Sequence, residues 1–289
     1  MTSWTLENDR WRITVKAQGA ELCELLDKRQ QRQRLWTPDP AVWNNSATQL
    51  FPVVGRLIHN GLHHDGEFWP LPAHGFLRQQ RFRLVKQRDD RLTLCCEESP
   101  ETQAIWPFRW RVTTHWHLTA TGLTVRWQVE NRDSRAFPFA LGWHPGFALP
   151  IATQPGWSVR FDRPASGPFF TDNRTLITPE TPARTTGFAL TADSFTNGAV
   201  YFGDMADCGV SVISPQGDCA LRLDSPQTPW LALWSVPGAD LLCIEPLTGT
   251  TDDPQFDGDV CHKRGMQWLA AGDTYHQQLS VTLAQDGGA

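Results

Sequence analysis

Apolar and polar residues alternate with a period of two along much of the chain. In residues 110–118, Trp, Val and Leu side chains occupy one face, and Arg, Thr and His side chains occupy the other. Residues 123–130 repeat this alternation after the short turn at 119–122. A strand with one buried face produces this pattern, so the two segments are predicted to pair as a β-hairpin.

The same reasoning predicts further hairpins, each with a polar or charged turn between its strands, and a last strand at 278–283. The expected hairpins pair 82–85 with 92–96 and 210–213 with 220–223.

Few segments suit a helix. Residues 21–27 fit one helical turn or, equally well, a bulged strand. The chain carries 21 Pro and 22 Gly, spread so that any long helix would meet a residue that breaks it. Many short strands joined by turns favour a sandwich or barrel. We therefore expect an all-β protein with a single domain spanning residues 1–289.

Composition narrows the class of protein. Lys and Arg total 26 against 31 Asp and Glu, which gives a net charge of −5, so no nucleic-acid partner is expected. No apolar run approaches the roughly 18 residues of a membrane span, and the first residues do not resemble a secretory signal. Seven cysteines with irregular spacing favour reduced, mostly buried thiols. The expected location is the cytoplasm, with no membrane contact.

Tryptophan is unusually frequent, with 14 Trp against 2 Tyr. An indole ring suits both the apolar face of a sugar and a thick β core. Core packing is expected to account for most of them.

Three short segments combine an ionisable residue with unusual neighbours. His74 is followed by Gly75, and His144 lies between Trp143 and Pro145. Glu245 ends an apolar run that predicts a buried strand. A carboxylate in that position needs a charged or hydrogen-bonding partner, or a functional role. Each segment alone is weak evidence, because a His beside Gly is more often structural and Glu245 alone fits a strand-end charge paired with an Arg.

Other ionisable residues favour simpler interpretations. His115 and His117 lie on the polar face of a predicted strand, and 63–64 falls in a polar turn. No His pair or carboxylate cluster has the spacing of a metal site. An acidic run that could suggest calcium departs from the standard binding loop, so a solvated loop is expected; it comprises Asp252, Asp253, Asp257 and Asp259.

Taken together and in order, the three segments resemble the aldose 1-epimerases of the galactose mutarotase superfamily. The two histidines and the glutamate follow one another as they do in that family. Residues 18–22 and 35–36 look like its opening strands, 51–57 like its Pro/Gly/Arg segment and 269–273 like its closing turn. The resemblance spans about residues 19–283 and implies a large antiparallel β-sandwich with a sugar site in a cleft on one sheet.

The resemblance also implies a reaction and roles for particular residues. The expected activity interconverts the α and β anomers of a free aldose by opening and closing the ring. Glu245 would take the proton of the C1 hydroxyl, His144 would protonate the ring oxygen, and His74 would share the developing charge. Glu245 is expected to be ionised and His144 protonated. Both steps are proton transfers, so no metal or organic cofactor is expected.

Substrate contacts are expected from four further side chains. Arg56 would bind sugar hydroxyls through its donor fork. Arg78 either binds substrate or lies on the surface, Asp193 either contacts substrate or caps a turn, and Trp143 either stacks on the sugar or packs in the core. Arg56 and Arg78 alone do not establish a phosphate site. The expected partner is a small sugar, and the chain is expected to be a monomer or homodimer.

Two departures from the family pattern put the substrate in question more than the reaction. Gly146 stands where relatives commonly have an aromatic residue, and Leu247 stands where Trp is common. The main alternative function is a sugar-binding or sugar-sensing protein without turnover. A lyase or hydrolase acting on glycans is a third reading, and it would need an extended groove.

Overall fold

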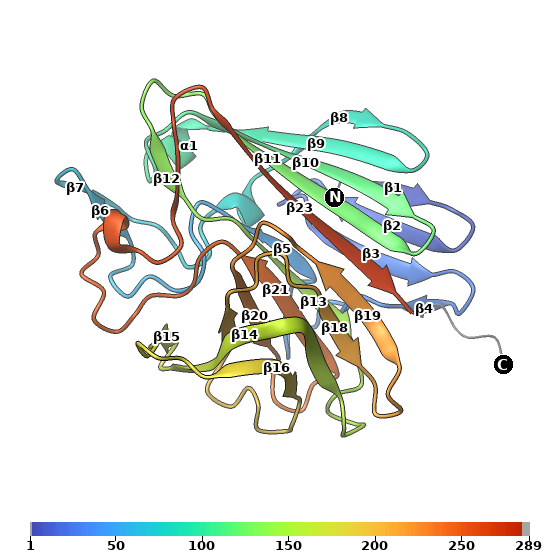
Figure 1. The fold of residues 1–289 in the computed structure, drawn as a ribbon. Helices are drawn as coiled ribbons and strands as arrows, with labels where there is room; N and C mark the ends of the chain where they lie inside the picture. Colours follow the sequence, from blue (N-terminus) through green and yellow to red (C-terminus); the bar gives the residue numbers. More distant parts are fainter. Residues whose placement is uncertain (1, 285–289) are drawn as a thin grey trace.

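The computed structural model describes residues 2–284 and is built almost entirely of antiparallel strands (Figure 1). The order along the largest sheet is β5-β13-β21-β20-β17-β14-β18-β19-β23-β11-β10-β9-β8, with β15 and β16 paired to β14. A four-stranded sheet, β1-β2-β3-β4, and the two-stranded pairs β12-β22 and β6-β7 complete the fold. The predicted all-β class and large antiparallel sandwich are confirmed.

The strands of the largest sheet have these bounds: β5 Ala47–Leu50, β8 Arg83–Gln87, β9 Arg91–Glu97, β10 Trp110–Thr119, β11 Gly122–Asn131, β13 Gly142–Ala148, β14 Ser158–Asp172, β15 Thr175–Leu176, β16 Arg184–Ala189, β17 Val200–Gly203, β18 Val210–Ile213, β19 Cys219–Asp224, β20 Trp230–Trp234, β21 Leu241–Leu247 and β23 Thr274–Leu283. The smaller sheets contain β1 Ser3–Glu7, β2 Trp11–Lys16, β3 Leu22–Asp27, β4 Arg32–Gln33, β6 Leu62–His64, β7 Glu67–Trp69, β12 Phe137–Phe139 and β22 Gln267–Leu269. The short helices are α1 Pro100–Gln103, η1 Leu77–Gln79 and η2 Val260–His262.

The hairpins predicted from alternation are present. β10 pairs with β11 from Trp110 opposite Asn131 to Thr119 opposite Gly122, and β8–β9 and β18–β19 form the other two. The ambiguous segment 21–27 is strand β3, and its pairing with β2 shifts register after Thr14. The bulged-strand alternative is therefore correct.

Tryptophan fills the core between the sheets, as expected from the composition. Six Trp side chains are less than 2% exposed: Trp11, Trp106, Trp110, Trp116, Trp127 and Trp143. One apolar cluster joins β2 and β3 of the small sheet to β10, β11 and β13 of the large one. This packing fixes the large sheet from one side, so the opposite side of β5, β13, β21, β20 and β17 is available to line a cavity.

Within residues 2–284, no helix has the length and apolar character needed to cross a membrane.

Candidate active site

The centre of the site is a pair of neighbouring strands interrupted by proline. β13 and β21 pair Gly142 with Leu247 and Gly146 with Cys243, so His144 and Glu245 lie opposite each other halfway between. Pro145 and Pro246 fall within this interval, and neither carries the N–H that a ladder hydrogen bond requires. Two residues 101 positions apart in the sequence thus become cross-strand neighbours.

The row across the sheet continues on both sides of this pair. Thr48 on β5 is opposite His144, and Glu245 is opposite Ala232 on β20, which is opposite Tyr201 on β17. We call the strand-borne cavity residues Thr48, His144, Glu245, Tyr201 and Trp234 the cavity floor; all five line one cavity of about 580 Å³.

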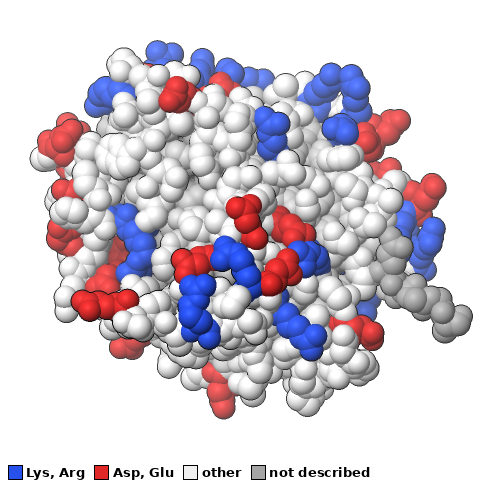
Figure 2. Space-filling model, in the orientation of Figure 1, with Lys and Arg blue, Asp and Glu red and all other residues white. Residues whose placement is uncertain are grey.

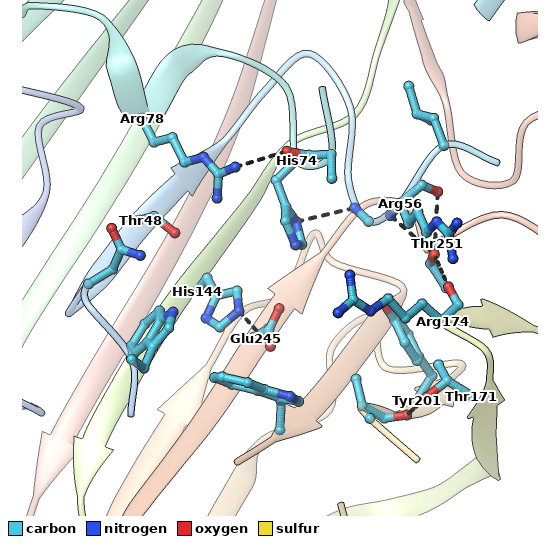
Figure 3. A pocket seen from close by; sticks show the side chains of 18 of the residues that line it. Thr48, Arg56, His74, Arg78, His144, Thr171, Arg174, Tyr201, Glu245 and Thr251 are labelled. Atoms are coloured by element: carbon cyan, nitrogen blue, oxygen red, sulfur yellow. Dashed lines mark hydrogen bonds and ion pairs between the residues drawn. The ribbon is translucent and has the colours of Figure 1, made fainter. Parts of the chain in front are cut away.

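His144 and Glu245 are in direct contact. Nε2 of His144 lies 3.3 Å from Oε1 of Glu245, and the two residues are 9% and 3% exposed (Figure 3). The Trp43 ring stacks on the His144 imidazole, with centroids 5.0 Å apart and planes at 26°. Trp234 packs edge-on against the same imidazole at 5.8 Å. These contacts hold the His144 ring in one orientation toward the carboxyl group.

Burial governs the protonation of this pair. It raises the pKa of Glu245 well above its ordinary value and lowers the pKa of His144 to about 3, with neighbouring His74 as a smaller cause. The cavity without substrate therefore favours a protonated carboxyl beside a neutral imidazole, and the expected ionised Glu245 with protonated His144 is the higher-energy arrangement. The two arrangements contain the same number of protons and differ by one transfer across the 3.3 Å contact.

His74 reaches the cavity from a turn whose backbone is strained. Its φ is +64°, a left-handed conformation that few non-glycine residues adopt. Two hydrogen bonds with Gly55 stabilise this backbone conformation. The His74 N–H donates to the Gly55 carbonyl at 2.9 Å, and the Gly55 N–H donates to His74 Nδ1 at 3.3 Å. Such strain at a residue that faces a cavity is typical of functional sites.

The hydrogen bond from Gly55 assigns a role to each ring nitrogen of His74. Because Nδ1 accepts a hydrogen bond from the Gly55 N–H, a neutral ring carries its proton on Nε2, which is then a hydrogen-bond donor. Burial, with smaller contributions from the charges of Arg78 and Lys263, lowers the pKa of His74 to about 4, so the ring is neutral near pH 7. The His74 and His144 rings lie 5.8 Å apart. His74 therefore offers a hydrogen-bond donor next to the His144–Glu245 pair.

Loop residues close the opposite side of the cavity. We call the loop-borne residues Gly55, Arg56, His74, Arg174 and Thr251 the cavity rim; all five line the cavity. Thr251 connects two of them, because its hydroxyl accepts from the Arg56 N–H at 3.1 Å and donates to the Arg174 carbonyl at 2.8 Å. Gly55 allows this close approach, since a Cβ there would lie 2.3 Å from the Thr251 Cα.

A buried ion pair supports the rim from behind. Lys263 Nζ donates to Asp252 Oδ1 at 2.6 Å and to the Thr250 carbonyl at 3.1 Å, and both charged side chains are 1% exposed. The other Asp252 oxygen accepts from the Ile58 N–H at 2.9 Å. The expectation of a solvated acidic loop is therefore wrong for Asp252. Among residues 2–284, no group of three or more His, Cys, Asp or Glu is arranged to hold a metal ion.

The structure brings five of the seven predicted site residues together. Glu245, His144, His74, Arg56 and Arg78 line the cavity.

The other two predicted site residues lie elsewhere. Trp143 is fully buried and packs against Trp116 and Trp127, because it precedes His144 in a strand and so points to the opposite face. Asp193 lies in an exposed turn, where its carbonyl accepts hydrogen bonds from Thr196, and it is not among the cavity residues. These two assignments are corrected.

Sequence reasoning missed several cavity residues. Trp43 comes from a loop, and Trp234 ends a short apolar run with no motif around it. Arg174 lies at the tip of the turn between β14 and β15, where it reads as an ordinary surface residue. Only the period-two pattern of β20 and β17 offered any signal for Trp234 and Tyr201.

The two departures from the family pattern have different consequences. A Cβ at Gly146 would lie 2.7 Å from the Trp43 ring, so the small residue makes room for the indole that stacks on His144. Leu247 is fully buried in a cluster with Leu50 and Val54 and does not line the cavity.

Comparison with known proteins identifies the family and the fold of this chain. The family model for aldose 1-epimerase matches residues 2–251. The LacX protein of Lactococcus lactis subsp. lactis is 23% identical over 298 aligned residues, which cover 96% of this chain and 98% of that protein. A galactose mutarotase-like protein from Lactobacillus casei superposes with a TM-score of 0.89 at 26% identity, covering 98% of this chain and all of the other.

A galactose mutarotase related enzyme from Lactobacillus acidophilus has the same fold, with a TM-score of 0.89 at 24% identity and 98% coverage of both chains. The resemblance inferred from the three motifs is thus confirmed over nearly the whole length, and the chain belongs to the aldose 1-epimerase family.

Proposed function

We propose that this protein is an aldose 1-epimerase, an isomerase that interconverts the α and β anomers of a free aldose. The observation that carries the proposal is the direct contact between His144 and Glu245 on the cavity floor, with Nε2 and Oε1 3.3 Å apart. An acid and a base that face one small cavity are the minimum that ring opening requires. The cavity of about 580 Å³ is of the size that small-molecule sites have.

The reaction uses the proton that the pair shares. Transfer of this proton from Glu245 to His144 produces a carboxylate and an imidazolium. The carboxylate removes the proton of the C1 hydroxyl while the imidazolium gives its proton to the ring oxygen, and the bond between C1 and the ring oxygen breaks. Rotation about the C1–C2 bond and the reverse transfers close the ring on the other face. Atoms and charges balance, because each group regains its starting proton.

His74 and the aromatic residues assist without changing protonation. The Nε2–H of His74 donates a hydrogen bond to the ring oxygen side of the sugar, where negative charge develops. Trp43 and Trp234 enclose the His144 imidazole, and stacking on an indole face favours an imidazolium over a neutral ring. This attraction offsets part of the burial that disfavours the charged pair.

The decisive experiment measures exchange between anomers by proton NMR on freshly dissolved aldoses. Wild type is compared with Glu245→Gln and with Glu67→Gln, a matched change of an exposed glutamate on β7. Accelerated exchange that is retained in Glu67→Gln and lost in Glu245→Gln supports the epimerase. A wild type that binds sugars without accelerating exchange on a panel of aldoses supports the sugar-binding alternative instead.

A further inference from the structure

Four carboxylate side chains are buried in the part of the chain that the structure describes: Glu21, Asp27, Glu245 and Asp252. Figure 2 shows the more common situation, in which Asp and Glu lie at the surface, many of them next to Lys or Arg. A carboxylate is costly to bury unless polar or charged groups surround it, so each buried one needs an explanation. Glu245 belongs to the proposed reaction, and Asp252 supports the rim. Glu21, which is 6% exposed, serves neither purpose.

Both oxygens of the Glu21 carboxylate have partners. Oε1 accepts hydrogen bonds from the backbone N–H groups of Ser46 at 2.7 Å and Ala47 at 3.1 Å. Oε2 lies 2.7 Å from Lys16 Nζ, which balances the charge. Hydrogen bonds to a charged acceptor are stronger than those between neutral groups. Glu21 therefore binds the start of β5 firmly.

β5 needs such support because it is the last strand of the large sheet. It pairs with β13 on one side, and no strand of residues 2–284 pairs along its other edge. Glu21 supplies acceptors at the start of that edge. The turn that carries His74 covers the far end, where the N–H groups of Phe76 and Leu77 donate to the Phe51 carbonyl at 3.0 and 3.2 Å. Side-chain and loop contacts thus replace the missing strand.

The start of β5 lies between residues that face the cavity. Trp43, whose ring stacks on His144, comes three residues before Ser46. The floor residue Thr48 comes two residues after Ser46 and is opposite His144. The Ser46 carbonyl also accepts a hydrogen bond from the Gly146 N–H of β13 at 2.8 Å. A displacement of this short segment would therefore move two neighbours of His144, although Ser46 itself does not line the cavity.

Asp27 provides a comparison at the other end of the same strand. It is the last residue of β3, and Glu21 directly precedes that strand. Asp27 Oδ1 accepts from the N–H groups of Arg29 and Gln30 at 3.0 and 3.3 Å. Its Oδ2 accepts from Arg10 Nη2 at 3.2 Å. The two carboxylates have the same kinds of partners, but neither the residues that Asp27 contacts nor their chain neighbours line the cavity.

We propose that Glu21 is a positioning residue for the reaction, because it fixes the start of β5 and so keeps Trp43 stacked on His144 and Thr48 beside it. The proposal rests on the epimerase function and adds a residue outside the cavity to it. Glu21 contacts neither substrate nor the reacting groups and acts through the orientation of the His144 imidazole. Loss of that orientation should slow proton transfer more than it weakens sugar binding, because transfer requires donor and acceptor in close alignment.

The test compares Glu21→Ala with Asp27→Ala. Each variant leaves two backbone N–H groups without their acceptor and a cation without its carboxylate, so both should lose stability. Anomer exchange of glucose and galactose is measured by proton NMR at a temperature at which both variants remain folded. We expect kcat to fall about 10- to 100-fold in Glu21→Ala with KM little changed, and to remain that of wild type in Asp27→Ala. Equal losses of kcat in the two variants would overturn the proposal.

Two double variants separate hydrogen bonding from charge. Lys16→Met with Glu21→Gln removes both charges but keeps an amide oxygen that can accept from the Ser46 and Ala47 N–H groups. Lys16→Met with Glu21→Met removes the acceptor as well, at nearly the same side-chain size. The first double variant should retain the kcat of wild type, and the second should lose it as Glu21→Ala does. The same kcat in both would show that the hydrogen bonds to β5 do not matter for the reaction.

The stacked ring offers a readout that needs no turnover. The ring current of Trp43 shifts the Cε1–H signal of His144 upfield, and this signal is assigned by its absence in His144→Asn. It should move toward the position of an unstacked histidine in Glu21→Ala and stay in place in Asp27→Ala. If wild type does not accelerate anomer exchange, the epimerase function fails, and this signal alone decides whether Glu21 positions His144. An unchanged signal in Glu21→Ala rejects that role.

Discussion

The floor and the rim of the cavity are built in different ways. The floor residues come from five neighbouring strands, and the register of the sheet brings His144 beside Glu245. The rim residues come from loops, where His74 and Arg174 adopt positive φ and are fixed by hydrogen bonds to Gly55 and Thr251. The floor thus depends on the whole sheet, whereas the rim depends on a few local contacts.

The difference separates two requirements of catalysis. Proton transfer needs donor and acceptor within hydrogen-bond reach, and a central sheet supplies that accuracy. Substrate selection needs side chains that can vary, and loops on a rigid scaffold supply them. We therefore expect changes in the floor, and changes of His74 on the rim, to affect kcat. Changes in the other rim residues should affect KM, specificity and local stability.

The largest effect is expected from Glu245→Gln on the floor. The amide cannot accept the C1 hydroxyl proton, so kcat should fall by about 10²–10⁴-fold. Because burial already favours a neutral group at this position, the melting temperature should not fall. NMR exchange rates and thermal unfolding measure the two quantities.

Thr251→Val provides the rim counterpart of that experiment. It removes the hydroxyl that joins Arg56 to Arg174, so KM should rise about 10-fold while kcat changes little. A fall in kcat as large as that of Glu245→Gln would remove the distinction between floor and rim.

The next largest effect concerns stability and involves Lys263→Met. This change leaves Asp252 buried without its cation, which should lower the free energy of unfolding by about 3–5 kcal/mol. Urea unfolding measures the loss. The double variant Asp252→Asn with Lys263→Met should recover part of it, because no unpaired charge then remains. A single variant as stable as wild type would show that the pair does not support the rim.

A smaller effect is expected from Gly146→Ala. The added Cβ would lie 2.7 Å from both the Trp43 ring and Leu241 Cδ1, so the indole must move off His144. We expect a loss of about 1–3 kcal/mol in stability and a lower kcat. Trp43→Leu, which removes the stacked ring without crowding, should reproduce the kcat loss if stacking on His144 is what matters.

The smallest effect is a pH dependence of stability that arises from His74. Its folded-state pKa of about 4 lies below the ordinary value, so the unfolded chain binds more protons between about pH 6.5 and 4. Stability from this residue is therefore present above pH 6.5 and is lost as the pH falls through that range. His74→Asn, which tolerates positive φ, should reduce the loss measured by urea unfolding at pH 7 and pH 4.5. An unchanged loss would show that His74 is not held neutral.

Much of the fold and the chemical centre could be predicted from the sequence. Alternation located the β10–β11 hairpin because each strand has one buried and one polar face. Glu245 was recognisable because a carboxylate in an apolar strand requires an explanation, and His144 because it lies between Trp143 and Pro145. The alternation also contained the correction for Trp143, since a residue next to His144 in a strand must face the other way.

Most of the rim and its supporting contacts could not be predicted from the sequence. Arg174 reaches the cavity because β15 folds back on β14, and nothing near 174 in the sequence marks that contact. Asp252 is buried by pairing with Lys263, 11 residues away, so an acidic loop did not have to be solvated. Contacts that depend on how loops pack against one another leave no periodic signal in a single sequence.

The register that pairs β13 with β21 limits how this protein can change during evolution. Strands on the floor tolerate no insertion of a single residue, because one step in register would turn Trp143 into the cavity and His144 into the core. Asn173 and Arg174 in the turn after β14, and Arg56 in its loop, are exposed. These two segments can therefore change in length without moving the register of the strands. Substrate preference can therefore evolve by remodelling loops, while the proton-transfer chemistry is inherited unchanged.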